Sequence, residues 1–344
     1  FNISVGLTEE FMDAVKNDAY YDLKFNDKVY DRFKAREIFS LIVERAWSNG
    51  EPGIVFLDTL NENNPTPALG KIEATNPCGE QPLLGYEACN LGSINLSNMV
   101  MDGKIDWDHL ADAVEWSVRF LDDVIEINNY PLDKVAEIVK GNRKIGLGLM
   151  GWADMLFKLQ IPYNSETAVD LAKKVMEFIQ EKAHQMSEKL AEERGDFPNI
   201  ELSIYQGKKH RNATCTTIAP TGTISMIAGT SSGIEPVFSI AYTKTVLDDT
   251  PLVEVNPVFE SYVRENYSHE EAEEIFQNVA ETGSVQELKL LPENIRKVFV
   301  TALEISSSWH IKMQAAFQSY CDNAVSKTVN FPKSATKDDV EEVY

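Results

Sequence analysis

The spacing of hydrophobic and polar residues predicts a series of amphipathic helices. The longest pattern covers residues 106–127, where apolar residues recur every three or four positions. A second covers residues 31–47 and ends before Gly50 and Pro52, and Thr8 is placed to begin a helix near the N-terminus. Further helices are expected over residues 164–194, 256–266, 269–280 and 308–320.

Short apolar or β-branched runs predict the strands between these helices. They are expected at residues 1–5, 53–57, 213–219, 239–246 and 328–331, and Lys144–Met150 fits either a strand or a turn. This alternation predicts an α/β fold with a mostly parallel sheet or barrel, in which ligands bind at the carboxyl ends of strands. Because no repeat, low-complexity tract or linker divides the chain, we expect a single domain over residues 1–344.

The charge and hydropathy of the chain exclude several classes of protein. A formal net charge of −22 argues against a duplex nucleic-acid binder, which needs a basic stripe, so any phosphate site must be built locally from backbone N–H groups. No apolar run approaches the roughly 18 residues of a membrane span, and residues 1–7 lack the flanks of a signal peptide. We therefore expect neither a nucleic-acid nor a membrane partner.

The four cysteines, Cys78, Cys89, Cys215 and Cys321, show no C-x-x-C spacing, and the five histidines do not cluster with them in the sequence. This argues against a zinc site and against a disulfide framework, so we expect no metal and a reducing, cytoplasmic compartment. Cys215 and Cys321 are interpreted as structural, and His310 as a packed or capping residue. Arg143 and Lys144 are interpreted as solvated charges.

The segment Asn76-Pro77-Cys78-Gly79-Glu80 is the strongest candidate for chemistry. In an extended chain, residues two apart share a face, so Asn76, Cys78 and Glu80 would place an amide, a thiol and a carboxylate in one row. Cys89 follows eleven residues later, far enough for the chain to return beside Cys78. The alternative is a buried structural cysteine beside a solvated glutamate, but the flanking Pro77 and Gly79 favour a loop tip.

This segment, with Glu87–Leu96 after it, resembles the finger loop of ribonucleotide reductase catalytic subunits, and most closely those of the adenosylcobalamin-dependent class II enzymes. The resemblance covers nearly the whole chain. Further stretches resemble that family in the same order: residues 1–5, Asn142–Gly148, Ala219–Ser225 and Asp322–Thr328. The resemblance implies part of a ten-stranded α/β barrel, with a central finger loop that carries the radical cysteine.

The resemblance also implies a role for each finger-loop residue in reducing ribonucleotides to deoxyribonucleotides. Cys78 would become a thiyl radical that abstracts the 3′-hydrogen, and Glu80 would take the 3′-hydroxyl proton while water leaves C2′. Asn76 would hydrogen-bond the ribose, and Cys89 would be one of two reducing thiols that end as a disulfide. Adenosylcobalamin would supply the radical, and an external dithiol such as thioredoxin the electrons.

The turn Pro220-Thr221-Gly222-Thr223-Ile224-Ser225 follows an expected strand and would open a helix or turn. By resemblance it would bind the substrate's phosphates, of a di- or triphosphate, through backbone N–H and hydroxyl groups. The loop Ser231–Pro236 would close the neighbouring wall. From the residues alone, an ordinary helix start with a Thr or Ser cap remains the alternative.

Several features of the family have no counterpart in this sequence. No cysteine precedes Cys78, no C-terminal thiol pair is present, and the effector loops that lie upstream in the family are missing. The iron-dependent class has adjacent tyrosines downstream of its finger loop, whereas the tyrosine pair of this sequence, Tyr20-Tyr21, lies upstream. The motif of the glycyl-radical class does not occur either. We therefore expect a partial barrel that needs a complementary chain or self-association.

The sequence leaves two alternatives to radical catalysis by this chain. One is a non-catalytic split or truncated subunit that completes the barrel of another chain. The other is a two-electron thiol enzyme, in which Cys78 would be a nucleophile with a depressed pKa.

Overall fold

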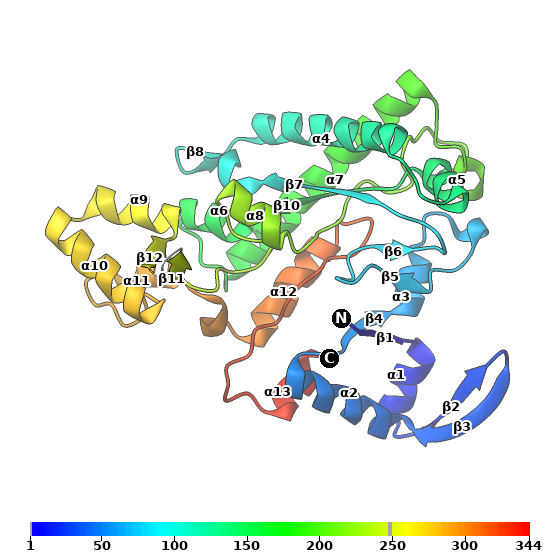
Figure 1. Ribbon diagram of the computed structural model, residues 1–344, viewed down its shortest axis with the longest axis horizontal. Helices are drawn as coiled ribbons and strands as arrows, with labels where there is room; N and C mark the ends of the chain where they lie inside the picture. The colour runs from blue at the N-terminus through cyan, green and yellow to red at the C-terminus, as the bar shows by residue number, and fades with distance from the viewer. Residues whose placement is uncertain (1, 247–249) are drawn as a thin grey trace.

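The computed structural model describes residues 2–246 and 250–344, which adopt a mixed α/β architecture (Figure 1). These residues form three main hydrophobic cores and a small fourth cluster around Phe197. In the N-terminal part, β1 (Ser4–Leu7) pairs in parallel with β4 (Gly53–Phe56), and α1 (Glu9–Lys16) and α2 (Ala35–Asn49) pack beside them. The last helix, α13 (Lys337–Val343), packs on α2, so the two ends of the chain lie close together (Figure 1). α1 begins after Thr8, whose side chain caps it as expected.

The helix expected over residues 31–47 is wrong at its start. Residues up to Lys34 belong to an antiparallel hairpin of β2 (Tyr20–Phe25) and β3 (Lys28–Lys34). Asn26 and Asp27 both have positive φ angles, which suits a two-residue turn between paired strands. This local hairpin therefore delays the helix to Ala35. The predicted strand at 1–5 forms at Ser4–Leu7, and Phe1 lies outside the described residues.

The central part is built on two parallel strands, β7 (Asn90–Asn95) and β10 (Ile145–Met150). Helix α4 (Trp107–Ile127) packs on both strands and against α7 (Glu166–Arg194), which in turn contacts α12 (Ser307–Gln318) (Figure 1). All six residues of β10 are buried, so this strand lies inside the largest core. The helices predicted at 106–127, 164–194 and 308–320 are confirmed, and the strand alternative for Lys144–Met150 is the correct one.

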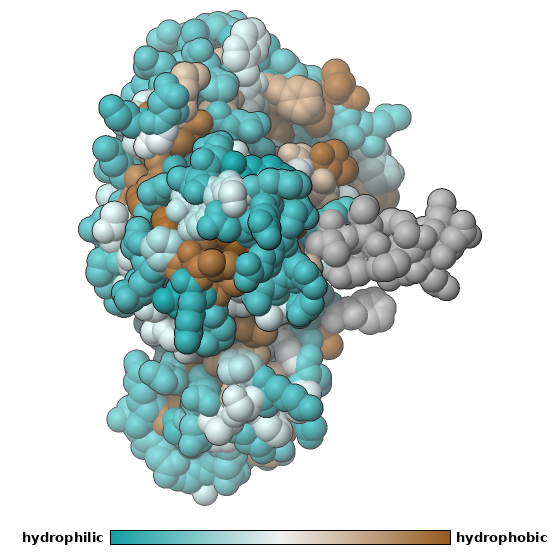
Figure 2. Space-filling view, turned by 90° about the vertical axis from the view of Figure 1, so that its left-hand side faces the viewer, coloured by the Kyte–Doolittle hydropathy of each residue, from teal (hydrophilic) through white to brown (hydrophobic). Residues whose placement is uncertain are grey.

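The third core lies under α9 (Pro257–Asn266), α10 (His269–Thr282) and α11 (Glu293–Val298), beside the antiparallel pair β11 (Ala241–Val246) and β12 (Thr250–Val255). Both predicted helices and the predicted strand at 239–246 are present. Figure 2 looks onto this end of the molecule, where the helices present a mostly hydrophilic face.

The remaining elements are short. They are α3 (Leu57–Glu62), β5 (Ala74–Thr75), β6 (Pro82–Leu83), β8 (Val100–Met101), β9 (Lys104–Ile105), α5 (Asp133–Asn142), α6 (Trp152–Lys158) and α8 (Gly222–Ala228). No helix in the described part of the chain is long and apolar enough to cross a membrane.

The strands do not form a continuous sheet. Across residues 2–246 and 250–344 the structure contains six two-stranded sheets, and none of them closes. The strand predicted at 213–219 is instead an extended segment with two isolated bridges, Leu147 to Thr216 and Ile218 to Val325. The strand predicted at 328–331 is wrong, because that segment makes no ladder and the contact lies earlier, at Val325. The mixed α/β class is confirmed, whereas a closed barrel is not seen in these residues.

Candidate functional site

The segment 76–81 is the tip of a hairpin rather than an extended row. Strands β5 and β6 pair antiparallel, and the Asn76 N–H donates to the Gln81 carbonyl at 3.1 Å across the base of the tip. The Gly79 N–H donates to the Asn76 carbonyl at 3.0 Å, and Gly79 has φ +83°, which closes a tight turn around Pro77 and Cys78. The predicted single row of Asn76, Cys78 and Glu80 is therefore wrong, because the turn sends these side chains into different environments.

Cys78 is the exposed member of this tip. Its partial burial, followed by the charge of Glu80, raises the pKa of the thiol above its ordinary value. The Asn2 amide nitrogen lies 3.9 Å from the Cys78 sulfur. At neutral pH the sulfur therefore carries its hydrogen, which is the form that exchanges a hydrogen atom rather than the form that attacks as a nucleophile.

Glu80 is the buried member, with 2% of its surface exposed. The backbone carbonyl oxygen of Glu80 accepts hydrogen bonds from the Ala324 N–H at 3.0 Å and from the Thr217 hydroxyl at 2.8 Å. One carboxylate oxygen, Oε2, has no partner among the described residues. A buried polar atom without a partner is unusual. Here it leaves the Glu80 carboxylate able to accept a proton, or a hydrogen bond from a hydroxyl group.

Cys89 lies one residue before β7, beside a buried ion pair. Lys144 Nζ lies 2.7 Å from Glu87 Oε2, and the side chains of both residues are almost completely buried. Burial raises the pKa of the Cys89 thiol, Lys144 lowers it, and Glu87 and Glu80 raise it further. The prediction that Arg143 and Lys144 are solvated is wrong, because each neutralises a buried carboxylate from a distant part of the chain.

The turn 220–225 opens helix α8, as expected. Thr221 has a positive φ of 57° and precedes the helix, but its side chain makes no cap hydrogen bond to α8. Its hydroxyl oxygen instead accepts from the Gly233 N–H at 2.7 Å, and the Ser225 and Ser232 hydroxyls lie 2.8 Å apart. The ordinary capping alternative is therefore wrong, since the loop after α8 folds back onto the turn.

A pocket of about 270 Å³ joins this turn to β7. It is lined by Leu91, Gly92, Ser93, Ala219, Thr221, Gly222, Thr223 and Ile224. Its walls thus come from the strand that follows Cys89 and from the turn that follows Thr217. Among the described residues, Pro220 and Ser225 flank this lining without belonging to it.

Two glycines of β10 allow these segments to meet. A Cβ at Gly146 would lie 2.7 Å from atoms of Gln81, Leu91 and Thr217, so three segments converge at that point. A Cβ at Gly148 would lie 2.2 Å from the Thr217 carbonyl oxygen. The hairpin tip, β7 and Thr217 therefore all pack against strand β10. This packing fixes the position of Glu80 relative to the turn 220–225.

Sequence reasoning missed three residues that hold the site in place. Thr217 binds Glu80, as described above. Asp154 is buried and accepts from the Thr230 hydroxyl at 2.8 Å and the Ser231 N–H at 2.7 Å, which fixes the loop after α8. Asp322 accepts from the Cys215 N–H at 2.7 Å. The motif beginning at Asp322 was a visible signal, but its partners lie more than a hundred residues away.

The structure also brings His184, Cys215 and Asp322 together, with one ligand atom of each within 4.8 Å of the others. The fold thus brings a histidine and a cysteine together that lie far apart in the sequence. His184 Nε2 lies 2.9 Å from Asp322 Oδ1, and Gln180 and the Cys215 N–H also occupy that carboxylate. The Asp322 carboxylate is thus occupied by protein donors, burial raises the pKa of the Cys215 thiol, and the absence of a metal stays a prediction.

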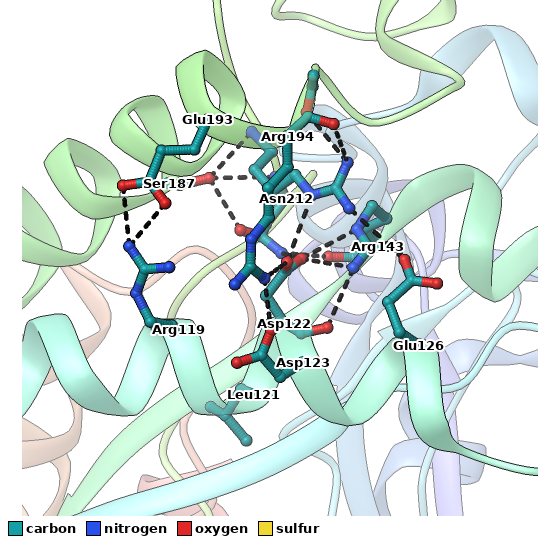
Figure 3. Close-up of polar contacts among 12 residues, drawn as sticks. Arg119, Leu121, Asp122, Asp123, Glu126, Arg143, Ser187, Glu193, Arg194 and Asn212 are labelled. Carbon is teal, nitrogen blue, oxygen red and sulfur yellow. Dashed lines mark hydrogen bonds and ion pairs between the residues drawn. The ribbon is translucent and has the colours of Figure 1, made fainter.

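A second buried network centred on Asp122 fixes α4 against β10 (Figure 3). The Asp122 carboxylate forms ion pairs with Arg143 at 2.7 Å, Arg194 at 3.2 Å and Arg211 at 3.3 Å. It also accepts a hydrogen bond from the Asn212 amide at 3.1 Å. Arg143 directly precedes Lys144, so the network holds the start of β10 where Lys144 meets Glu87.

Comparison with known proteins gives the chain a consistent set of relatives. It matches the family described as "Ribonucleotide reductase, barrel domain" over residues 1–211 and 204–344. It is 52% identical to a vitamin B12-dependent ribonucleoside-diphosphate reductase of Thermoplasma acidophilum, covering 100% of this chain and 45% of that protein. A protein of the same name from Mycobacterium tuberculosis is 48% identical over 100% of this chain and 50% of its own length.

Among solved structures, the class Id ribonucleotide reductase alpha subunit of Actinobacillus ureae is similar, with a TM-score of 0.73 and 26% identity. That match covers 94% of this chain and 58% of the other. This chain therefore spans about half the length of the curated relatives it matches.

Proposed function

We propose, from the premise that this chain belongs to the ribonucleotide reductase barrel-domain family, that it carries the reacting side chains of a ribonucleoside-diphosphate reductase. The observation that supports this most directly is an exposed, protonated thiol two residues from a buried carboxylate with an unpartnered oxygen. The diphosphate comes from the names of two curated relatives, which are 52% and 48% identical to this chain.

Each residue of the hairpin tip has a proposed role. Cys78, as a thiyl radical, abstracts the ribose 3′-hydrogen, and Glu80 accepts the 3′-hydroxyl proton as water leaves C2′. The Asn76 Oδ1 accepts from the Gln81 N–H at 3.0 Å, which fixes the tip and leaves the Asn76 NH₂ group to donate to the ribose. Cys89 is one of the two thiols that supply the reducing equivalents.

The turn 220–225 is proposed to hold the substrate's phosphates. The first turn of a helix leaves N–H groups without partners inside the helix, and three of the turn's residues that line the pocket, Gly222, Thr223 and Ile224, lie in the first turn of α8. In a chain of net charge −22 this local set of donors matters, because the overall field repels an anion.

Cobalamin is the proposed cofactor, since relatives that are 52% and 48% identical over the whole chain are named vitamin B12-dependent. When bound, adenosylcobalamin supplies the oxidising equivalent that converts a thiol to a thiyl radical. The exposed Cys78 fits this requirement, because its sulfur is accessible at the tip and its raised pKa keeps the hydrogen in place. Cys78 is the residue that we assign to face the cofactor.

We further propose that the chain is a single, partial domain of a ten-stranded barrel with the hairpin tip as its finger loop. The unclosed two-stranded sheets and the half-length match to the relatives support a complementary segment that completes the barrel. A dithiol such as thioredoxin is the proposed reductant, and the four free cysteines support a cytoplasmic setting.

The comparisons do not favour a non-catalytic role, because the relatives that match the entire chain are named as reductases. A two-electron thiol enzyme is disfavoured by the raised pKa of Cys78, since such an enzyme needs a thiolate.

The test uses the chain assembled with the barrel segment it lacks. Cys78→Ser should abolish deoxyribonucleotide formation, by at least about 10³-fold, while nucleotide binding stays within about twofold, because serine keeps the shape but has a much stronger bond to hydrogen. Cys321→Ser is the matched control and should retain turnover. Appreciable activity in the Cys78→Ser protein would refute the radical role.

Cys89→Ser gives an independent test of the reducing role. It should stop multiple turnovers driven by an external dithiol, because the disulfide that drives reduction cannot form. Product formation would be followed by chromatography over time. Unchanged cycling would remove Cys89 from the mechanism.

A further inference from the structure

The buried ion pair Glu87–Lys144 lies next to Cys89, the proposed reducing thiol. Lys144 has 1% of its side chain exposed and Glu87 none. Glu87 Oε2 also accepts from the Leu84 N–H at 2.9 Å, and Glu87 Oε1 accepts from the Asn142 amide at 2.6 Å. The pair thus pins the loop that leads from the hairpin to Cys89.

The strand register brings Lys144 beside Cys89. In the parallel pair β7–β10, Ile145 lies opposite Asn90, so the residues immediately before them are Lys144 and Cys89. Paired positions on neighbouring parallel strands project to the same side. The Lys144 ammonium group, paired with Glu87, therefore lies on the same side of the two strands as the Cys89 sulfur.

We propose that Lys144, held in place by Glu87, is a positioning residue that supplies positive charge beside the Cys89 sulfur and favours its thiolate form. This inference rests on the proposed function, because it concerns the re-reduction of a disulfide that contains Cys89. In that step a thiolate of an external dithiol attacks the partner sulfur, the S–S bond breaks, and Cys89 leaves with the electron pair. The second thiol of the reductant then closes the reductant's own disulfide, and the two protons of the dithiol pass to the two released cysteines.

The charges around Cys89 have a clear order. Burial is the largest influence and raises the pKa of the thiol, Lys144 opposes it, and Glu87 and Glu80 act against Lys144. Cys215, from the segment on the other side of β10, also interacts electrostatically with Cys89, and burial raises the pKa of the Cys215 thiol. Lys144 is thus the cation that offsets burial and two carboxylates.

The test exploits the fact that the two halves of the pair have opposite charge. Lys144→Met and Glu87→Gln both break the same contact, so a purely structural role changes Cys89 reactivity in the same direction in both proteins. The proposed electrostatic role predicts opposite changes. The rate of Cys89 alkylation by iodoacetamide would be measured on the purified chain at several pH values, with peptide mass spectrometry to separate the four cysteines.

At a fixed pH below the thiol pKa, Lys144→Met should slow alkylation of Cys89 about threefold or more, and Glu87→Gln should accelerate it by a similar factor. One pKa unit changes the thiolate fraction tenfold, and the loss or gain of intrinsic nucleophilicity reduces this to about threefold. The double variant Glu87→Gln/Lys144→Met removes both charges and should fall between the two. It also keeps the test decisive where one single variant does not fold, as circular dichroism would reveal.

Lys327→Met is the matched control, because Lys327 is also fully buried and paired with a glutamate, Glu235. It should leave the Cys89 rate unchanged. Changes in the same direction in both single variants, or changes no larger than in the Lys327→Met protein, would overturn the proposal. Because alkylation needs no nucleotide or cofactor, such a failure is separate from the turnover tests of the proposed function.

Discussion

Replacing Gly148 by alanine tests the close contact on which the site depends. The new Cβ would lie 2.2 Å from the Thr217 carbonyl oxygen, whereas ordinary contacts begin near 3.4 Å. The neighbour is backbone, so it cannot rotate away, and the two segments must separate by about 1 Å. That separation weakens two hydrogen bonds, from the Leu147 N–H to the Cys215 carbonyl at 2.7 Å and from the Thr217 N–H to the Leu147 carbonyl at 3.1 Å.

The expected cost is about 3–5 kcal/mol of unfolding free energy. Overpacking contributes about 1–3 kcal/mol, and each weakened hydrogen bond contributes about 1 kcal/mol. Gly92→Ala is the matched control, because Gly92 lies on the partner strand opposite Leu147. A Cβ at Gly92 would lie 3.5 Å from Leu121, an ordinary contact, so this variant should stay within about 1 kcal/mol of the parent.

The assay is urea unfolding of the purified chain, followed by circular dichroism and tryptophan fluorescence. The same Gly148→Ala protein, assembled with its complementary segment, should lose turnover, because Thr217 also holds Glu80. A Gly148→Ala protein as stable as the Gly92→Ala protein would refute the close approach of β10 to residue 217.

Two further predictions concern the buried networks. Asp122→Ala should lower the unfolding free energy by about 3 kcal/mol in a urea titration, because it leaves Arg143 buried without its main partner. As a control, Asp170→Ala at an exposed site should change the unfolding free energy by less than about 0.5 kcal/mol. Equal effects of the two substitutions would contradict a stabilising role of the Asp122 network. Burial alone lowers the pKa of His184, but Asp322 raises that pKa above 6.5 in the folded protein. The stability contributed by protonated His184 beside Asp322 is therefore complete below pH 6.5 and is lost as the pH rises through the pKa of His184 in the folded state. His184→Gln should therefore differ from the parent more at pH 5.5 than at pH 8.5, and a constant difference would refute the coupling.

The sequence predicted best those elements whose signals are local. Helix α4 follows from its apolar spacing and from Asp106, whose side chain caps it, and α7 follows in the same way from Ser165. The hairpin before α2 was missed although Asn26-Asp27 is a usable turn signal, because the apolar spacing of residues 31–47 was read as one helix. The candidate residues Asn76, Cys78 and Glu80 were singled out because Pro77 and Gly79 flank the thiol, and their roles stay predictions.

The features that were mispredicted depend on partners far away in the chain. Arg143 and Lys144 look like surface charges until Asp122 and Glu87 are placed beside them. The segment 213–219 has the composition of a strand, but its neighbours offer only isolated bridges. Because of the turn at Gly79, Cys78 is exposed whereas Glu80 is buried. The alternation of side chains along a strand predicts the same side for both residues and therefore misses this difference.

The anchoring of Glu80 by Thr217 and Ala324 has a consequence for biosynthesis. Thr217 is added 137 residues after Glu80, and Ala324 later still. At about 5–20 residues per second, the ribosome needs roughly 7–27 s to supply even the first of these anchors. The Glu80 backbone is therefore anchored well after Cys78 and Glu80 have been synthesised, so the hairpin tip leaves the ribosome before the contacts that fix it can form.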